Sequence, residues 1–218
     1  LILSLFIFSC SPPNNYDILI KNGTIADGSG TPTYLGSVAI NADTIAAVGK
    51  LKATGTLEID ATGLIVAPGF INVLSWATES LIEDGRSLSD IMQGVTLEVF
   101  GEGWSMGPLD EDLKKDLQSA QGDIKYEMDW NTLDEYLQSL TKRGISPNVA
   151  SFIGATTVRI NHMGYENRAP TDQELTSMKN MVKEAMEDGA LGVGSSLIYA
   201  PAFYSSTEEL IALCKVAS

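Results

Sequence analysis

Hydrophobic positions in the first third of the chain occur in short runs, and turn-forming residues separate one run from the next. This pattern predicts short β-strands joined by tight connections. The runs lie at 17–21, 24–26, 36–40, 44–48, 57–60 and 64–66. Asn22-Gly23 is expected to form a tight turn between the first two runs, and residues 27–30 a loop. We therefore expect residues 16–67 to form a small β-domain.

The pattern changes at Pro68-Gly69, where Pro fixes φ and Gly permits positive φ, so that the preceding apolar run is broken. The next run is short and mostly apolar, with Phe70, Ile71, Val73 and Leu74. Its length and composition predict a strand that is buried on both faces.

Strand-like and helix-like segments alternate from this point to the last residue. Strands are expected at 70–74, 95–100, 148–153 and 191–194, and helices near 88–93, at 131–142, at 172–188 and from about 207 onward. Thr171 is expected to cap the third helix and Gly189 to end it, while Ser206 or Thr207 caps the last one. Residues 101–130 are expected to form a long loop. Four successive βα units predict an α/β fold with a parallel sheet.

The N-terminal residues have a different character. Residues 1–8 are apolar except for Ser4, and they are followed by Ser9-Cys10 and a polar, Pro-containing stretch. This order matches the end of a bacterial lipoprotein signal, and the apolar run is too short to span a bilayer. We expect residues 1–15 to be a signal and linker, with Cys10 lipidated and the protein held at the bacterial cell envelope by that anchor alone. The alternative is an uncleaved apolar tail.

Composition excludes several classes of function. A net charge of −14 and a pI of about 4.3 argue against nucleic acid, because binding phosphates requires a basic face. Two cysteines and one histidine are too few for a disulfide framework or a Cys/His zinc module. The chain has neither a Gly-x-Ser-x-Gly nucleophile motif nor a phosphate-binding loop.

Several motifs carry a family resemblance. Tyr16-Asp17, Lys21-Asn22-Gly23, Asp27-Gly28-Ser29-Gly30 and Pro68-Gly69-Phe70-Ile71 resemble phrases of the amidohydrolase superfamily. Met163-Gly164, the following Arg168-Ala-Pro-Thr and the segment 189–201 resemble its N-acyl-D-amino-acid deacylase (D-aminoacylase) family. The resemblance covers about 16–218. It implies a β-domain of β-sandwich type, followed in residues 68–218 by the first four βα units of a (β/α)8 barrel. Such a barrel needs eight units and about 250 residues, so we expect a truncated half barrel.

The resemblance also locates the expected metal site. The superfamily usually has two metal-binding histidines at the end of strand 1, where this chain has Leu74 and Trp76. Strand 2 of the family ends in a metal-binding Cys, where this chain has Gly103 with Glu102 beside it. A glutamate at a strand end can bind metal, so Glu102 is the candidate ligand, with Glu98 as a weaker alternative. The other possibility for Glu102 is a loop carboxylate that faces solvent. The resemblance implies one zinc ion, held mostly by residues outside this chain, and catalytic residues beyond Ser218.

Substrate contacts are expected after strand 4, because barrel active sites lie at the carboxyl ends of the strands. Tyr199, Ser195 and Ser196 are the candidates, since their hydroxyls can bind a substrate carboxylate or carbonyl. His162 is expected to be a loop histidine with a structural or substrate-edge role. Trp76 and Trp104 are expected to line the pocket, and Asn72, Ser75 and Ser105 can only form hydrogen bonds.

Two functions remain open from the sequence. The first is a metal-dependent hydrolase that cleaves the amide bond of N-acyl-D-amino acids or related acyl amides, with a small-molecule N-acyl amino acid as its partner. The present 218 residues alone would then be inactive. The second is a catalytically dead, membrane-tethered binding protein that keeps the pocket and has lost the metal.

Overall fold

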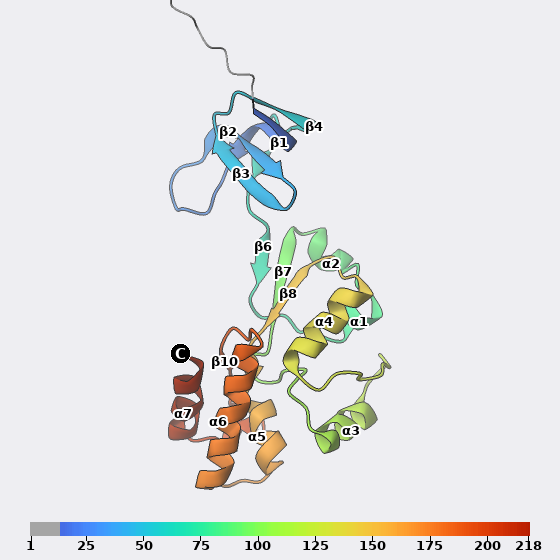
Figure 1. Ribbon diagram of the computed structural model, residues 1–218, viewed down its shortest axis with the longest axis vertical. Coiled ribbons are helices and arrows are strands. Elements are labelled where there is room, and N and C mark those ends of the chain that lie inside the picture. The colour runs from blue at the N-terminus through green and yellow to red at the C-terminus, as the bar shows by residue number, and fades with distance from the viewer. Residues whose placement is uncertain (1–13) are drawn as a thin grey trace, which may run out of the picture. The chain divides into compact units, whose positions relative to one another are not determined.

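The computed structural model describes residues 14–218, so the predicted signal peptide and Cys10 lie outside the described residues. The chain divides into two compact units, Leu1–Pro68 and Gly69–Ser218. The strands of each unit form sheets of their own (Figure 1). Within residues 14–218, none of the helices has both the length and the apolar character needed to cross a membrane.

The first unit is built on one five-stranded sheet. Its strands are β1 (Asn14–Ile25), β2 (Tyr34–Asn41), β3 (Thr44–Gly49), β4 (Ala53–Asp60) and β5 (Ile65–Val66). The order is β3-β2-β1-β4, and β5 also pairs with β1. β1–β2 and β2–β3 are antiparallel, whereas β4 and β5 both run parallel to β1. The described strands of this unit form one sheet and not two facing layers.

The tight turn expected at Asn22-Gly23 is wrong, because β1 continues through both residues. The pairing of β1 with β2 shifts register between Ile20 and Gly23, and Asn22 has a φ of 62°. These are the properties of a β-bulge, which bends a strand without ending it. The glycine is needed for space, since a β-carbon at Gly23 would lie 2.5 Å from Cγ2 of Val66. β1 also begins at Asn14, inside the stretch expected to be linker.

The second unit contains parallel strands. They are β6 (Phe70–Asn72), β7 (Val95–Phe100), β8 (Asn148–Ser151), β9 (Ile153–Gly154) and β10 (Val193–Gly194). β6, β7 and β8 form one parallel sheet in that order, and β9 pairs in parallel with β10. The third expected strand is therefore divided at Phe152 into β8 and β9. The amide of Phe152 donates to the carbonyl of Phe100, and this bond keeps the two pieces beside β7.

Helices connect these strands, as Figure 1 shows. They are α1 (Ser80–Glu83), α2 (Leu88–Ile91), α3 (Glu111–Ala120), α4 (Leu133–Arg143), α5 (Ala155–Met163), α6 (Asp172–Glu187) and α7 (Thr207–Ala217), with a short 3₁₀ helix η1 (Ala202–Tyr204). Thr171 caps α6 in a reciprocal capping box with Glu174, and Ser206 caps α7. Both expected caps are confirmed.

Three expectations for this unit are wrong. Residues 101–130 are not a continuous loop, because they contain α3, whose first turn is capped by Asp110. His162 lies in the last turn of α5 and not in a loop. The strand at 70–72 is not buried on both faces: the side chains of Phe70 and Ile71, which point to opposite faces, are 63% and 56% exposed. Among the described residues β6 pairs only with β7, so it forms an edge of its sheet.

The core of the second unit is formed by residues of the strands and of helices α1 and α3 to α7. Phe100 at the end of β7 packs against the ring of Tyr136 of α4. Trp130 also packs against the ring of Tyr136, with a centroid separation of 5.2 Å. The indole nitrogen of Trp130 donates to the carbonyl of Met106 at 2.6 Å. These contacts attach the segment after β7 to the core and thereby fix the carboxyl end of that strand.

Candidate functional site

The carboxyl ends of β7, β9 and β10 converge backbone to backbone. A β-carbon at Gly101 would lie 2.1 Å from the carbonyl oxygen of Phe152, and one at Gly194 would lie 1.9 Å from that of Gly101. A β-carbon at Gly154 would lie 2.3 Å from the carbonyl oxygen of Gly103. A side chain at any of these three positions would push the backbone segments apart, so their close approach requires glycine. Residues 101–103 therefore form the centre of the candidate site.

Ser105 stabilises this convergence. Its backbone amide donates a hydrogen bond to Oγ1 of Thr157 at 2.8 Å, and its Oγ accepts a hydrogen bond from the amide of Gly154 at 3.0 Å. The same hydroxyl donates to the carbonyl of Gly107 at 2.6 Å. The side chain is buried. Ser105, expected only to form hydrogen bonds, thus acts as a structural link between the segment after β7 and the start of α5.

Glu102 lies at the carboxyl end of β7 with a half-buried side chain. It forms no hydrogen bond or ion pair with the described residues, so both carboxylate oxygens remain available for a ligand. Within residues 14–218, no three His, Cys, Asp or Glu side chains are grouped closely enough to hold a metal ion. The described residues therefore do not form a metal site by themselves, because a zinc site needs three or four protein ligands.

Glu98, the alternative ligand, has a structural environment. Its side chain is 0% exposed, and its carboxylate accepts hydrogen bonds from Oγ of Ser75 at 2.5 Å and from Oγ of Ser87 at 3.0 Å. A buried carboxylate requires such donors to compensate for lost hydration. Ser75 thereby joins the segment after β6 to the middle of β7.

The expected substrate residues lie on the segment 195–206 between β10 and α7. Ser196 lies against Gly103, since a β-carbon at Gly103 would be 2.8 Å from the β-carbon of Ser196. Ser195 is exposed, and Tyr199 is 63% exposed. The structure thus brings Ser196 beside residues 101–103. The hydroxyl of Tyr199 forms no hydrogen bond with the described residues.

The positions expected for histidines carry no metal-binding groups. Leu74 and Trp76 are both exposed. Asn72 instead caps the end of β6, because its Oδ1 accepts the amide of Leu74 at 3.2 Å. Trp104 is partly buried and packs against the core cluster. Trp76 remains free to line a pocket, whereas Trp104 supports the fold.

His162 is half-buried on α5, and its Nε2 is buried without a hydrogen-bond partner in the described part of the chain. Burial lowers the pKa of its imidazole, and the carboxylates of Asp110 and Glu174 only partly oppose this shift. The uncharged form is therefore favoured, which agrees with a structural role for this residue.

Sequence reasoning missed an ion pair that supports the same region. Arg159 on α5 and Glu209 on α7 form a fully buried pair with an Nη1–Oε2 distance of 2.7 Å. A signal was present: Arg159 stands within the apolar and small residues of Ala155–Met163, where an unpaired charge would be costly. Its partner, 50 positions away, could not be identified from one sequence.

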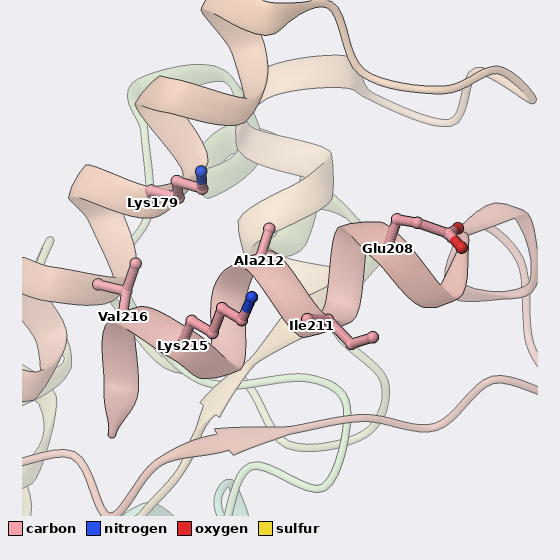
Figure 2. Close-up of a pocket in the computed structure, with 6 residues that line it drawn as sticks. All are labelled: Lys179, Glu208, Ile211, Ala212, Lys215 and Val216. Atoms are coloured by element: carbon pink, nitrogen blue, oxygen red, sulfur yellow. The ribbon is translucent and has the colours of Figure 1, made fainter.

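A groove of about 410 Å³ lies between α6 and α7 and is separate from the strand ends (Figure 2). It is lined by Lys179, Glu208, Ile211, Ala212, Lys215 and Val216. Figure 2 shows that the carboxylate of Glu208 points away from both lysines. No charged groups converge there, so this groove is not the candidate site.

Known proteins that are similar to this chain include several N-acyl-D-amino-acid deacylases. D-aminoacylase of Alcaligenes xylosoxydans xylosoxydans is 34% identical over 212 residues, which cover 95% of this chain and 43% of that protein. N-acyl-D-aspartate deacylase of the same organism is 32% identical over 205 residues, covering 93% and 41%. No protein-family model matches the chain.

Solved structures give the same result. A crystal structure of D-aminoacylase, described as defining a novel subset of amidohydrolases, matches 92% of this chain and 43% of its own, with 30% identity and a TM-score of 0.77. N-acyl-D-glutamate deacylase from Bordetella bronchiseptica, in complex with zinc and a phosphonate inhibitor, matches 94% and 43%, with 29% identity and a TM-score of 0.80. The chain is therefore similar along nearly its whole length to the N-acyl-D-amino-acid deacylases (D-aminoacylases) and has an amidohydrolase-type fold. It spans less than half the length of these relatives.

Proposed function

We propose that the whole protein hydrolyses the amide bond of N-acyl-D-amino acids or of related acyl amides and depends on a metal ion. The observation that carries this proposal is the match to deacylases along nearly the whole chain, together with the convergence of β7, β9 and β10 at Glu102 and Ser196. The names of the relatives specify different amino acids. The proposal therefore covers the reaction and does not specify the amino-acid side chain of the substrate.

The candidate residues of this chain would bind and orient the substrate. Ser196 beside Gly103, with Ser195 and Tyr199 on the same segment, would donate hydrogen bonds to the carboxylate or carbonyl of the substrate. The segment carrying them has no charged residue between Gly189 and Ser206. It therefore offers neutral donors together with exposed apolar side chains to a small acylated molecule.

Zinc is the metal we propose, since the deacylase from Bordetella bronchiseptica contains it. The described residues do not satisfy its coordination, so Glu102 would supply one ligand and residues outside this chain the others. When bound, the ion would polarise the amide carbonyl and activate water. We assign the general base and the remaining catalytic groups to residues outside the present sequence.

The proposal extends to architecture and location. We propose that the sheet of the first unit is one layer of a β-sandwich and that β6 to β10 belong to a (β/α)8 barrel completed by further chain. The support is the match to D-aminoacylase over 92% of the chain. We also propose anchoring at the bacterial envelope through Cys10, on the basis of the lipoprotein-like sequence around it.

The direct test is hydrolysis of paired N-acetyl-D- and N-acetyl-L-amino acids by the full-length protein, with the bound metal quantified by elemental analysis. Release of free amino acid from the D-enantiomers, lost on chelation and restored by zinc, is the expected result. A folded protein with no activity towards any member of the panel would contradict it.

One observation favours the second function, a binding protein without catalysis. Leu74 and Trp76 stand at the expected histidine positions, and the described residues group no three metal ligands. Under this function the full-length protein would bind an N-acyl-D-amino acid in calorimetry without cleaving it. Binding and turnover measured on the same preparation therefore separate the two.

A further inference from the structure

The buried ion pair between Arg159 and Glu209 joins three segments of the second unit. The side chains are 0% and 2% exposed, and Nη1 of Arg159 donates to Oε1 and Oε2 of Glu209 at 2.9 and 2.7 Å. Nη2 donates to the carbonyls of Glu166 and Arg168 at 3.1 and 2.6 Å. One guanidinium therefore connects α5, the turn before α6 and the first turn of α7.

Glu209 extends this connection to the segment 195–206. Its Oε1 accepts a hydrogen bond from Oγ of Ser205 at 3.1 Å, and its amide donates to Oγ of Ser206, the cap of α7. Ser205 is also joined to η1, since its amide donates to the carbonyl of Ala202. The C-terminal end of the segment is thus attached to α5 through Arg159.

The N-terminal end of the segment is fixed at a different place. Ser196 lies against Gly103, at the carboxyl end of β7. Between the two ends the side chains of Leu197, Ile198 and Tyr199 are exposed. The segment has a third attachment between them, because Ala202 of η1 is 2% exposed and η1 packs against α5, and the position of the exposed part depends on these attachments. Of these, only the attachment through Glu209 involves a buried charge.

We propose that Arg159 is a positioning residue that holds the segment 195–206, with Tyr199, in place over the carboxyl ends of the strands. Its effect on catalysis rests on the proposed function, but its effect on the segment does not. Arginine suits this role because its planar fork can serve a carboxylate and two carbonyls together. A lysine could pair with Glu209 but would leave the carbonyls of Glu166 and Arg168 without their donor.

The test uses Arg159→Lys in the full-length protein, with hydrogen exchange followed by mass spectrometry. The amides of Phe203, Tyr204 and Ser205 are the reporters, because they donate to carbonyls within the segment and are protected when it is ordered. We expect them to exchange roughly 10-fold faster or more in the variant, while amides of β7 are unchanged. We expect kcat/KM to fall by about 10-fold to 100-fold, mainly through a higher KM.

The matched control is Arg168→Lys. Arg168 also pairs with carboxylates, Glu166 and Glu174, but its side chain is 38% exposed, and its hydrogen bonds within the described residues go to Glu166, Ala169 and Glu174 and not to the segment 195–206. Exchange of the three reporter amides and kcat/KM should both remain close to wild type. Should Arg159→Lys fail to fold, Ser205→Ala removes the hydrogen bond from the segment to the carboxylate of Glu209 while leaving the ion pair and the Ser206 cap in place, and it should raise the same exchange rates.

Unchanged exchange at the reporter amides in both Arg159→Lys and Ser205→Ala would overturn the proposal. Faster exchange without a change in kcat/KM would overturn the positioning role in catalysis. A wild-type protein without hydrolytic activity would contradict the proposed function instead, and the exchange comparison would still decide whether Arg159 holds the segment.

Discussion

Gly103 and Ser196 approach each other so closely that a β-carbon placed on Gly103 would lie 2.8 Å from the β-carbon of Ser196 and 3.0 Å from its amide nitrogen. The second atom belongs to the backbone, so a side chain at residue 103 can be accommodated only if the segment after β10 moves. This contact links the strand end that carries Glu102 to the segment that carries the candidate substrate residues.

Gly103→Ala is therefore expected to lower the free energy of unfolding by about 1–3 kcal/mol, as overpacking at a rigid site does. Urea denaturation of the full-length protein measures this change. Gly122→Ala is the control, because a β-carbon at Gly122 would have no neighbour within 4 Å and should change stability by less than about 0.5 kcal/mol. Equal midpoints for both variants would show that the contact with Ser196 has no energetic consequence.

Glu102→Gln tests the proposed metal ligand. The substitution keeps the shape of the side chain but removes its charge, so we expect metal content and hydrolysis to fall together, by about 10-fold or more. Elemental analysis and the amino-acid release assay supply the two readouts. Glu127→Gln, at an exposed glutamate in the same connection between β7 and α4, is the matched control. If neither metal content nor rate changes in Glu102→Gln, Glu102 is only a loop carboxylate.

Local signals predicted much of the fold. The strand at 95–100 was located to the residue, because β-branched and apolar residues there follow a glycine and precede one. Thr171 was located as a helix cap, and Ser206 was one of two candidates with Thr207, for a similarly local reason: each capping hydroxyl accepts the amide three residues later. Signals of this kind need only a few neighbouring residues, and one sequence contains them.

Elements that depend on tertiary packing were missed. Helix α5 begins Ala155-Thr-Thr-Val, which favours a strand by propensity, and most of its residues are buried, so no polar face reveals a helix. The bulge at Asn22 was interpreted as a turn, since Asn-Gly is the usual sequence of one. In the candidate site, sequence identified the strand ends, but the approach of Gly103 to Ser196 and the pairing of Arg159 with Glu209 join residues 93 and 50 positions apart.

Lipidation of Cys10 is a further prediction, and it lies outside the described residues. The full-length protein, made in a bacterium with its complete signal, should carry a diacylglyceryl adduct on Cys10, because an apolar run followed by Cys is the pattern that lipoprotein processing recognises. Mass spectrometry of the N-terminal peptide measures this. Cys10→Ser should yield an unlipidated protein, and an unmodified N-terminus upstream of Cys10 in the wild type would contradict the prediction.

The last prediction concerns pH and His162, whose pKa is lowered by burial. The unfolded chain has its histidine pKa near 6.5 and therefore binds more protons than the folded protein as the pH falls below that value. The folded state is thus expected to lose stability as the pH decreases from about 7 to 5, and to show no contribution from His162 above about pH 7.5. His162→Gln, which stays neutral, should remove this part of the pH dependence. Denaturation midpoints of both proteins at pH 5, 6, 7 and 8 test it: the wild type should lose stability relative to the variant on acidification, and parallel curves would show that the imidazole titrates equally in both states.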